Sequence, residues 1–599
     1  MRLFFTRSNP YERQHFLEFD AYLTQPFRPP TVFLDRKLLC QRHAQAWLLG
    51  EFFRQLWTPG AKAGAMTAYG KMGGFCGVEM AGVWQKAVSI KPPLQAPILH
   101  QMRQEQPWAS AGIQDSIENL FDRFLQWAST NDECRRSIGQ LLDKTNGQSD
   151  EAEWPNFVGF CRKKFQDGVE EWKQDYKSLL ETWNSIDRTN ANERSKANAI
   201  WQQLNFYWSK TVIETLGDSG ILPRYGFPIG LTKLQVLGET NTYFRGAEES
   251  SARLQRDSIL ALREYVPESK IVVGGKVLTS QGILKSWLND NTLGLHGRFV
   301  RAGNYFDYST TDQPPQMPSG MKGEIGCMIF PKHGFVTARW QEPTENDEPE
   351  RVGVVTVHTR AFETPQNIEN LGSLFGSLSG VMAEYKDRGE ILVLNGGANG
   401  TGYAVCQRCG FSASERPRGH PDYNRHPTEY STHRSVFAKK ETKGQQKRPC
   451  GGDAWRERYF AARQITNLLS ITLPSHLSGS NEVVLRTIGQ ALRLSGCQML
   501  GLDPREIRYL DPVPDHATGL YRSIVLYDAL AGGSGHLLEL SREDKASTWL
   551  KEAHHLLAPD VEDMKLRHHI AMKRLLTADC LEALDPCGAA DAFKALLMK

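Results

Sequence analysis

The sequence lacks any long hydrophobic run. None of its 599 residues falls in a stretch of about 18 consecutive apolar residues, which excludes a transmembrane helix by sequence pattern. The opening residues, Met-Arg-Leu-Phe-Phe-Thr-Arg, lack the apolar stretch and the small-residue cleavage site of a secretory signal. We therefore expect a cytoplasmic protein without a membrane partner. An excess of one charge is also missing, because 71 Lys and Arg face 68 Asp and Glu. Only the distribution of charge along the chain can therefore point to partners.

The motifs of several enzyme classes are missing too. The sequence contains no Walker A motif, acidic ATPase motif or arginine-finger motif, and no GxSxG, HExxH or HxE pattern. We therefore expect no ATPase motor in this chain. Two glycine-rich stretches need a separate explanation. Residues 396–402 lack the GxGxxG spacing of a dinucleotide site and lead into a cysteine pair instead of a helix.

The second glycine-rich stretch, residues 532–535, joins a predicted strand at 523–527 to a predicted helix that begins at His536. Backbone amides in that context can bind a phosphate. The stretch lacks the Lys-Ser/Thr pair of a P-loop, so an ATP site is disfavoured. We interpret it as a packed strand-to-helix turn, with a contact to a DNA phosphate as the alternative.

The hydrophobic content of 40% and charged content of 23% are those of a globular protein, and the length suggests about four domains. Apolar residues recur at helical intervals in two stretches and again near the C-terminus, whereas the middle is rich in short β-like segments and turns. The sequence predicts helices over 35–56, 105–216, 459–473 and 482–500, and a hairpin in which 271–273 and 277–278 flank Gly274-Gly275. The predicted fold class is α+β, with a segment at 1–104, a helical insert at 105–216, a β-rich domain at 217–390 and an α+β domain at 391–599.

A metal site is predicted by the spacing of two cysteines in the last domain. Cys406 and Cys409 are separated by two residues, so both sulfurs can reach one tetrahedral ion, and Gly410 allows the tight turn around them. A predicted strand at 403–405 would deliver this knuckle. Cys450 is the only other cysteine nearby and is the third candidate ligand.

The fourth ligand is expected to be a histidine. We favour His433 over His426, and place His420 last. Three thiolates and one imidazole select zinc over calcium or magnesium. The sequence therefore predicts a structural Zn²⁺ held by Cys406, Cys409, His433 and Cys450. The alternatives are a chance pair of buried thiols and a catalytic zinc.

Positive charge gathers around this cysteine module. Residues 406–463 contain thirteen Lys and Arg against six Asp and Glu, with aromatic residues between them. Cations engage phosphates and aromatic rings stack on unpaired bases, so this stretch is a candidate for contact with single-stranded DNA. A solvated basic loop is the simpler explanation. The candidate DNA-contacting residues are Arg408, Arg434, Lys439, Lys440, Arg456 and Arg458.

Several segments in this order resemble a known helicase family. The segments lie at 222–229, 254–257, 261–267, 282–283, 395–397, 402–410 and 526–536. Together they resemble the C-terminal half of superfamily-two DEAD/DEAH-type helicases that end in an MrfA-type zinc-binding (MZB) domain. The family's glycine loop reads Tyr-Asp, two or three residues, then Gly-Gly-Ala-Gly, and here Ser534 replaces the alanine. The helix predicted at 35–56 is also similar to the segment after the motor in those helicases.

The resemblance implies a zinc-stabilised accessory region that helps a helicase hold DNA, as in repair helicases and in phage-defence proteins such as the DISARM subunit DrmB and the Druantia helicase DruE. It covers about 220–540 best. This chain departs from the family because the motor is absent and because only Cys580 and Cys587 remain of a C-terminal cysteine cluster. These two residues are an alternative to His433 as ligands.

The resemblance and the missing motor together favour a non-catalytic, DISARM-like partner of a superfamily-two helicase ATPase in antiviral defence. The first alternative is the C-terminal part of a single-chain helicase of the same family. The second is a metal-dependent nuclease built around His420, His426 and the zinc.

Overall fold

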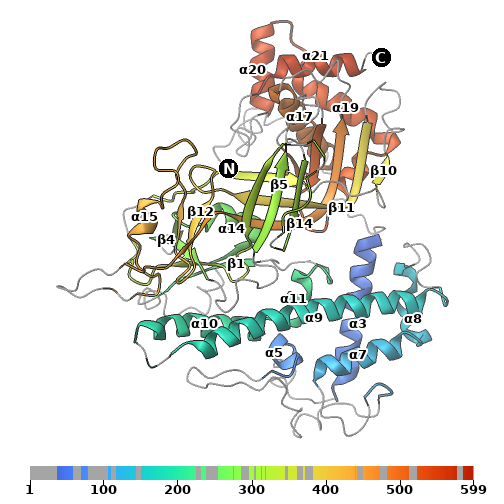
Figure 1. Cartoon of the computed structure of the whole chain (residues 1–599). Coiled ribbons are helices and arrows are strands. Elements are labelled where there is room, and N and C mark those ends of the chain that lie inside the picture. The colour runs from blue at the N-terminus through green and yellow to red at the C-terminus, as the bar shows by residue number, and fades with distance from the viewer. Residues whose placement is uncertain are drawn as a thin grey trace, which may run out of the picture.

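The computed structural model describes most of the chain. The described residues are 37–58, 69–78, 106–109, 116–142, 150–187, 189, 191–223, 231–237, 254–273, 275–284, 296–302, 305–311, 313–317, 319–320, 322–344, 348–359, 368–370, 382–438, 440, 449–472, 482–510, 523–575 and 584–597. They form three tiers: a helical layer, two sheets above it, and a group of C-terminal helices on the far side (Figure 1). Within these ranges no helix is long and apolar enough to cross a membrane.

The helical layer comes from the first third of the chain. Its helices are α3 (Lys37–Leu56), α5 (Met72–Phe75), α7 (Ile117–Ala128), α8 (Asp132–Leu142), α9 (Trp154–Ser185), α10 (Ala191–Ser209) and α11 (Val212–Asp218). Their apolar stripes meet in one aromatic core, where the rings of Phe52, Phe121 and Phe124 lie within 6.3 Å of one another. Burial of such a stripe stabilises each helix more than its intrinsic propensity does. The described parts of the predicted helical stretches 35–56 and 105–216 are therefore mainly helical.

The predicted helical run at 200–216 is interrupted. It divides between α10 and α11 at Thr211, whose hydroxyl accepts the Glu214 amide while the Glu214 carboxylate accepts the Thr211 amide. This capping box satisfies the first free amides of a new helix and sets its direction. The chain consequently turns at the end of α10, and α11 packs back against α9.

Five short strands form the smaller sheet, in the order β2-β1-β8-β4-β3. They are β1 (Leu231–Gln235), β2 (Gln255–Asp257), β3 (Lys270–Val273), β4 (Lys276–Ile283) and β8 (Phe335–Thr337), and α14 (Ser258–Glu264) follows β2. The predicted hairpin is confirmed, because β3 pairs antiparallel with β4 and Val273 faces Lys276 across the turn.

The larger sheet has eleven strands, with the central order β10-β11-β14-β7-β5-β6. The strands are β5 (His296–Ala302), β6 (Tyr305–Ser309), β7 (Glu324–Ile329), β9 (Val355–Thr359), β10 (Ile368–Asn370), β11 (Met382–Asn395), β12 (Tyr403–Cys406), β13 (Ser412–Ser414), β14 (Ala454–Thr472), β15 (Ile507–Tyr509) and β16 (Ser523–Asp528). The predicted domain boundary at residue 390 falls inside β11, so strands from both sides of it share this sheet.

The helix predicted at 459–473 is wrong, because these residues belong to the long strand β14. This strand pairs with β11, β12, β16 and β7, and most of its residues from Tyr459 to Ile471 are buried. A strand that is covered on both faces reads as a continuous apolar run, which periodicity cannot distinguish from a buried helix. Pairing with distant strands decides the outcome here.

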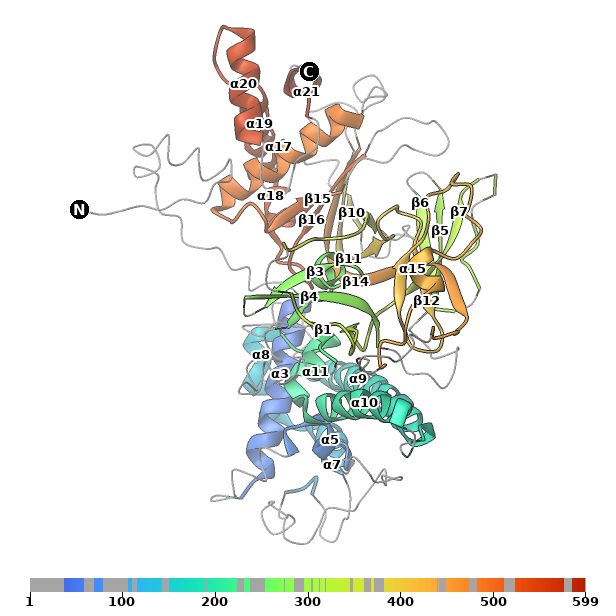
Figure 2. The same cartoon turned by 90° about the vertical axis from the view of Figure 1, so that its left-hand side faces the viewer.

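The C-terminal helices pack on the end of the larger sheet. They are α17 (Glu482–Leu500), α18 (His536–Leu540), α19 (Glu543–Leu557), α20 (Met564–Leu575) and α21 (Pro586–Leu597). Seen from the side, α17 lies next to β15 and β16, and α18 contacts β14 and β16 (Figure 2). The helices α20 and α21 lie farther from the sheet and pack on α17 and α19. The prediction of a helix at 482–500 is confirmed. The α+β fold class is confirmed as well, since helices and large sheets both contribute.

His333 lies where the helical layer meets the sheets. Its carbonyl accepts a hydrogen bond from the Gln203 amide at 3.1 Å, and its ring lies 5.7 Å from the ring of Tyr207. Complete burial, assisted by the charge of Lys332, lowers the pKa of His333 to about 3. The His333 imidazole is therefore neutral in the folded protein at ordinary pH.

This burial predicts a pH dependence of stability. Between pH 6.5 and 5.0 the unfolded state binds a proton at His333 and the folded state does not, so the free energy of unfolding falls by about 1.5 kcal/mol on acidification. We expect His333→Asn to remove that part of the pH dependence, as measured by urea unfolding at the two pH values. His420→Asn is the control, since His420 is exposed. An unchanged pH dependence in His333→Asn would contradict a neutral, buried His333.

Candidate metal centre

The cysteine knuckle is formed by two short strands. β12 ends at Cys406, the chain turns through Cys409 and Gly410, and β13 returns alongside. The Cys406 amide donates to the Phe411 carbonyl, and the Gly410 amide donates to the Cys406 carbonyl. Gly410 adopts a φ of 79°, which favours glycine. The sequence prediction of a strand that delivers the first cysteine is confirmed.

The predicted ligands Cys406, Cys409, His433 and Cys450 are brought together in one cluster. Their donor atoms all lie within 4.8 Å of one another. The Cys406 and Cys450 sulfurs are 3.9 Å apart, and the Cys409 sulfur lies 3.5 Å from Nε2 of His433. A tetrahedral ion with Zn–S bonds of about 2.3 Å and Zn–N bonds of about 2.0 Å needs edges of roughly 3.8 and 3.5 Å. The donor set therefore fits a zinc-sized tetrahedral ion, and three of its members are buried.

The imidazole is held in a defined orientation. Nδ1 of His433 lies 2.5 Å from the Tyr430 carbonyl, which directs Nε2 toward the sulfurs. The rings of Phe411 and Tyr430 lie 4.6 and 4.8 Å from the imidazole ring. A hydrogen bond to the non-ligating nitrogen is the usual means by which proteins fix the tautomer of a metal-binding histidine.

The cluster is also tied to elements on either side. The Cys450 amide donates to the His433 carbonyl at 2.9 Å, which joins two ligand-bearing segments. On the other side, the Ile283 amide of β4 donates to the Gly410 carbonyl at 3.0 Å. A Cβ on Gly282 would lie 2.2 Å from that carbonyl oxygen, so only glycine permits the contact. The knuckle thereby connects the two sheets.

The thiols influence one another strongly. Hydrogen bonds from Cys409 and Cys450 lower the pKa of Cys406 far below that of an ordinary thiol. Burial opposes ionisation of Cys409 and, with the neighbouring sulfurs, raises its pKa. A buried thiolate is costly unless a positive charge compensates it, and a cation at the centre of the four donors would provide that charge.

The alternative ligands lie outside the cluster. His426 is exposed and stacks on the ring of Tyr430 at 4.9 Å, and His420 is exposed with its Nδ1 accepting the Asp422 amide. Cys587 lies in α21, with its sulfur 3.7 Å from Nδ1 of His568. Cys580 falls outside the described residues. Four protein donors leave no open position on a tetrahedral ion, so this geometry matches a structural site better than a nuclease centre.

The candidate DNA-contacting residues divide into two groups. Arg408 and Lys440 are both exposed: Arg408, between the two knuckle cysteines, donates to the Cys450 carbonyl, and Lys440 pairs with Glu342. Arg434 is half-buried, with its guanidinium 5.3 Å from the ring centre of Trp340. Lys439 lies outside the described residues. These positions leave Arg408 and Lys440 the most accessible of the predicted cations that the structure describes.

Arg456 and Arg458 are partly buried and lie against other parts of the protein. Arg456 forms a bidentate ion pair with Glu415, whose side chain is 1% exposed, and also donates to backbone carbonyls of residues 423–425. Arg458 lies in β14 opposite Tyr403 and Cys327, and its Nε is buried. The geometry therefore argues against the predicted DNA contact of Arg456, because its guanidinium already compensates a buried carboxylate.

The glycine loop at 532–535 is a packed turn that surrounds a carboxylate of the chain itself. One oxygen of Asp528 accepts the amides of Ser534 and Gly535, each at 2.8 Å, and that of His536 at 3.3 Å. The Gly535 amide also donates to Asn467 at 3.0 Å. These amides would otherwise be available to a phosphate. Asp528 takes that place, which confirms the packed turn over the phosphate-binding alternative at these three amides.

Sequence reasoning missed the residues that support the imidazole and the turn. Tyr430 lies three residues before His433, and this short spacing within a helical turn was the available signal. Gly452 is a second omission, since a Cβ there would lie 2.6 Å from the Cys406 sulfur. The Gly451-Gly452 pair after Cys450 was visible in the sequence, but its steric reason requires the folded knuckle.

Loss of one thiolate should release the ion. We expect Cys409→Ser to lose about one equivalent of zinc and to lower the free energy of unfolding by several kcal/mol, because structural zinc binding is coupled to folding. Elemental analysis and urea unfolding measure the two effects. Cys497→Ser is the matched control. Cys497 is equally buried, but it lies in α17 within the hydrophobic core of the C-terminal helices. Full zinc retention by Cys409→Ser would reject the ligand assignment.

The choice among histidines can be tested in the same way. His433→Ala removes the Nε2 donor and should weaken zinc retention during dialysis against a chelator, whereas His426→Ala removes only an exposed ring that stacks on Tyr430. The expected order of zinc loss is therefore His433→Ala first, with His426→Ala like the unmodified chain. The reverse order would assign the fourth ligand to His426.

Comparison with known proteins gives little guidance. No known protein family and no curated protein matches the sequence. Among solved structures, the chain is similar to the crystal structure of the DUF1998 helicase MrfA bound to DNA, with a TM-score of 0.28 and 10% sequence identity. The match covers 61% of this chain and 33% of that one, so it spans about a third of the helicase. A likeness of this degree carries no conclusion about function.

Proposed function

We propose that this chain is a non-motor accessory subunit of a superfamily-two helicase or translocase, and that a structural zinc ion maintains the part of it that contacts DNA. The observation that carries the proposal is the cluster of Cys406, Cys409, His433 and Cys450. A catalytic zinc site keeps one coordination position for water or substrate, whereas these four donors complete a tetrahedron. The ion stabilises the folded state, and the residues around it form the surface that contacts DNA.

The helicase setting is supported by the sequence. The segments shared with MZB-type helicases include the cysteine knuckle and the glycine loop, and the chain lacks a Walker A motif. ATP hydrolysis is therefore assigned to a partner chain. The same resemblance extends to DISARM and Druantia proteins, which supports a role in antiphage defence. A neighbouring gene for a helicase would support this setting.

DNA contact is proposed for two exposed cations, Arg408 at the zinc cluster and Lys440 in the segment between two of its ligands. Arg408 extends from the turn between the two knuckle cysteines, and Lys440 is exposed on the segment between His433 and Cys450. Their present partners are a carbonyl and an exposed carboxylate, which a phosphate can replace at low cost because exposed ion pairs are weak. Single-stranded DNA would then bind at a surface whose shape depends on zinc.

Charge reversal tests this surface. We expect the double variant Arg408→Glu with Lys440→Glu to bind a single-stranded oligonucleotide about tenfold more weakly at low salt and to show a smaller salt dependence, because each lost phosphate contact lowers the slope of log K against log salt by roughly 0.7. Fluorescence anisotropy measures both quantities. Arg505→Glu is the control, since Arg505 is exposed beside β15 and pairs with Asp503. Equal affinity in all three proteins would exclude this surface.

The same preparations test the accessory role. The isolated chain is expected to hydrolyse no ATP, with or without DNA. A helicase encoded by a neighbouring gene is expected to co-purify with this chain and to hydrolyse ATP faster in its presence. Clear ATP turnover by the isolated chain, retained in Cys409→Ser, would overturn the assignment of the motor to another protein.

A further inference from the structure

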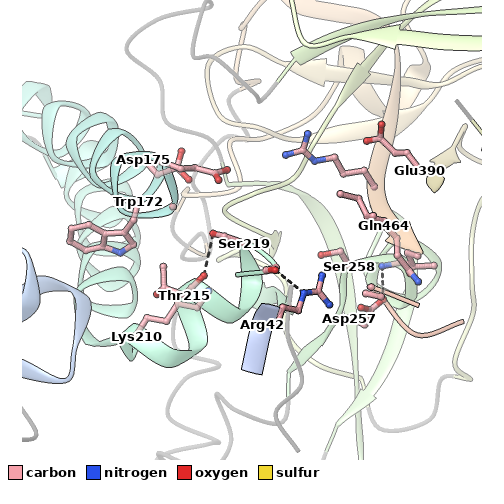
Figure 3. A pocket seen from close by; sticks show the side chains of 18 of the residues that line it. Arg42, Trp172, Asp175, Lys210, Thr215, Ser219, Asp257, Ser258, Glu390 and Gln464 are labelled. Atoms are coloured by element: carbon pink, nitrogen blue, oxygen red, sulfur yellow. Dashed lines mark hydrogen bonds between the residues drawn. The ribbon is translucent and has the colours of Figure 1, made fainter. Parts of the chain in front are cut away.

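A cavity of about 400 Å³ lies between the helical layer and the sheets. Its wall combines α3, α9, α10 and α11 on one side with α14, β11, β14 and the glycine loop on the other. In Figure 3, Trp172 and Asp175 lie on one side, Gln464 and Glu390 on the opposite side, and Arg42 and Ser219 between them. Its volume is within the usual range of small-molecule sites. The zinc cluster contributes no residue to this wall.

The acidic groups of the wall are engaged by other groups. Glu171 and Asp175 both pair with Lys332, at 3.2 and 3.8 Å. Asp257 accepts the Ile259 amide as the N-cap of α14, and Glu390 accepts the Tyr308 hydroxyl. Each carboxylate therefore has a donor that stabilises its charge.

Two arginines from distant parts of the chain line this cavity. Arg42 of α3 donates from Nε to the Gly220 carbonyl at 2.9 Å, which fixes its guanidinium at the cavity wall. The guanidinium also lies against Gly532, where an added Cβ would be 2.2 Å from it. Arg463 of β14 is exposed and lies at the opposite wall with Gln464. A single anion between these walls would meet positive charge from two elements.

The charge balance limits the kind of ligand. The wall holds Arg42, Lys210 and Arg463 with four carboxylates, and Lys332 behind it brings the total close to neutral. A strongly charged polyanion gains little from such a site, whereas a ligand with one phosphate and a larger polar body suits it. Aromatic residues Trp172 and Tyr207 and the Gln464 amide complete the wall. Trp172 is buried and stacks on Tyr176, so Tyr207 is the more accessible ring for contact with a nucleobase. The side-chain oxygen of Gln464 can accept a hydrogen bond from a base, while its nitrogen donates to the Ala529 carbonyl at 2.9 Å.

We propose that this interlayer cavity binds one nucleoside monophosphate unit, with its phosphate near Arg42 and Arg463. The unit is either a free nucleotide or one residue of a DNA strand, and the second case rests on the proposed function. Ile465 of β14 lines the cavity and is 42% exposed, so it adds apolar surface to the wall. The glycine loop serves here as a wall, while its amides remain bonded to Asp528.

A steric plug tests the cavity without removing charge. Ser219 is exposed at the C-cap of α11 and lines the cavity, so Ser219→Trp should fill it. We expect this variant to bind thymidine monophosphate at least tenfold more weakly than the unmodified chain by calorimetry. Ser129→Trp is the matched control, because Ser129 is also a helix C-cap whose hydroxyl donates to a carbonyl of its own helix, and it lies away from the cavity.

Photocrosslinking of the unmodified chain provides a second measurement that needs no variant. A short oligonucleotide with 4-thiothymidine should crosslink to peptides containing residues 207–219 or 463–465, and thymidine monophosphate should compete. Crosslinks confined to the zinc surface around Arg408, with no binding of the mononucleotide, would overturn the cavity site and leave the proposed function standing. Plug-sensitive mononucleotide binding without any DNA binding would support the cavity and contradict the proposed DNA contact. Absence of mononucleotide and oligonucleotide binding alike would overturn the cavity site.

Discussion

The pairing of β14 with its neighbours is the constraint on which the other features depend. This strand has 19 residues and hydrogen-bonds with β11, β12, β16 and β7. At about 3.3 Å per residue it runs roughly 60 Å. Its first residue faces Cys406, its middle supplies Arg463 to the cavity wall, and Asn467 further along accepts an amide of the glycine loop. One strand therefore sets the positions of the three notable sites.

The metal cluster has an energetic role that its position explains. Cys406 and Cys409 belong to the same buried cluster as the helices of the first tier, linked through residues such as Leu284 and Val336. Small rearrangements at the knuckle are therefore resisted by a close-packed core. An ion held by these four donors would replace covalent or apolar connections in a segment that has short strands and many turns.

The sequence was sufficient for the local features and insufficient for those that depend on distant pairing. Helical periodicity predicted α3 and α17, and cysteine spacing predicted a cluster that includes His433. The strand β14 was predicted as a helix because its apolar run has no period that excludes one. The commitment of Arg456 to Glu415 was equally invisible, since the pair is separated by 41 residues and depends on burial. The residues that line the cavity range from α3 to the glycine loop. No local sequence pattern predicts that residues so far apart in the chain lie together.

The contact between Gly410 and β4 has a consequence for the order in which the chain is assembled. The outermost ligands, Cys406 and Cys450, lie only 44 positions apart, so the four donors can close around an ion before the C-terminal helices are synthesised. β4 is synthesised before the knuckle. Its Ile283 amide can donate to the Gly410 carbonyl once the knuckle has closed. Short loops close with less entropy loss than long ones. Metal binding during translation would thus allow β4 and the closed knuckle to dock as two preformed pieces. This docking would cost less chain entropy than the pairing of two flexible segments.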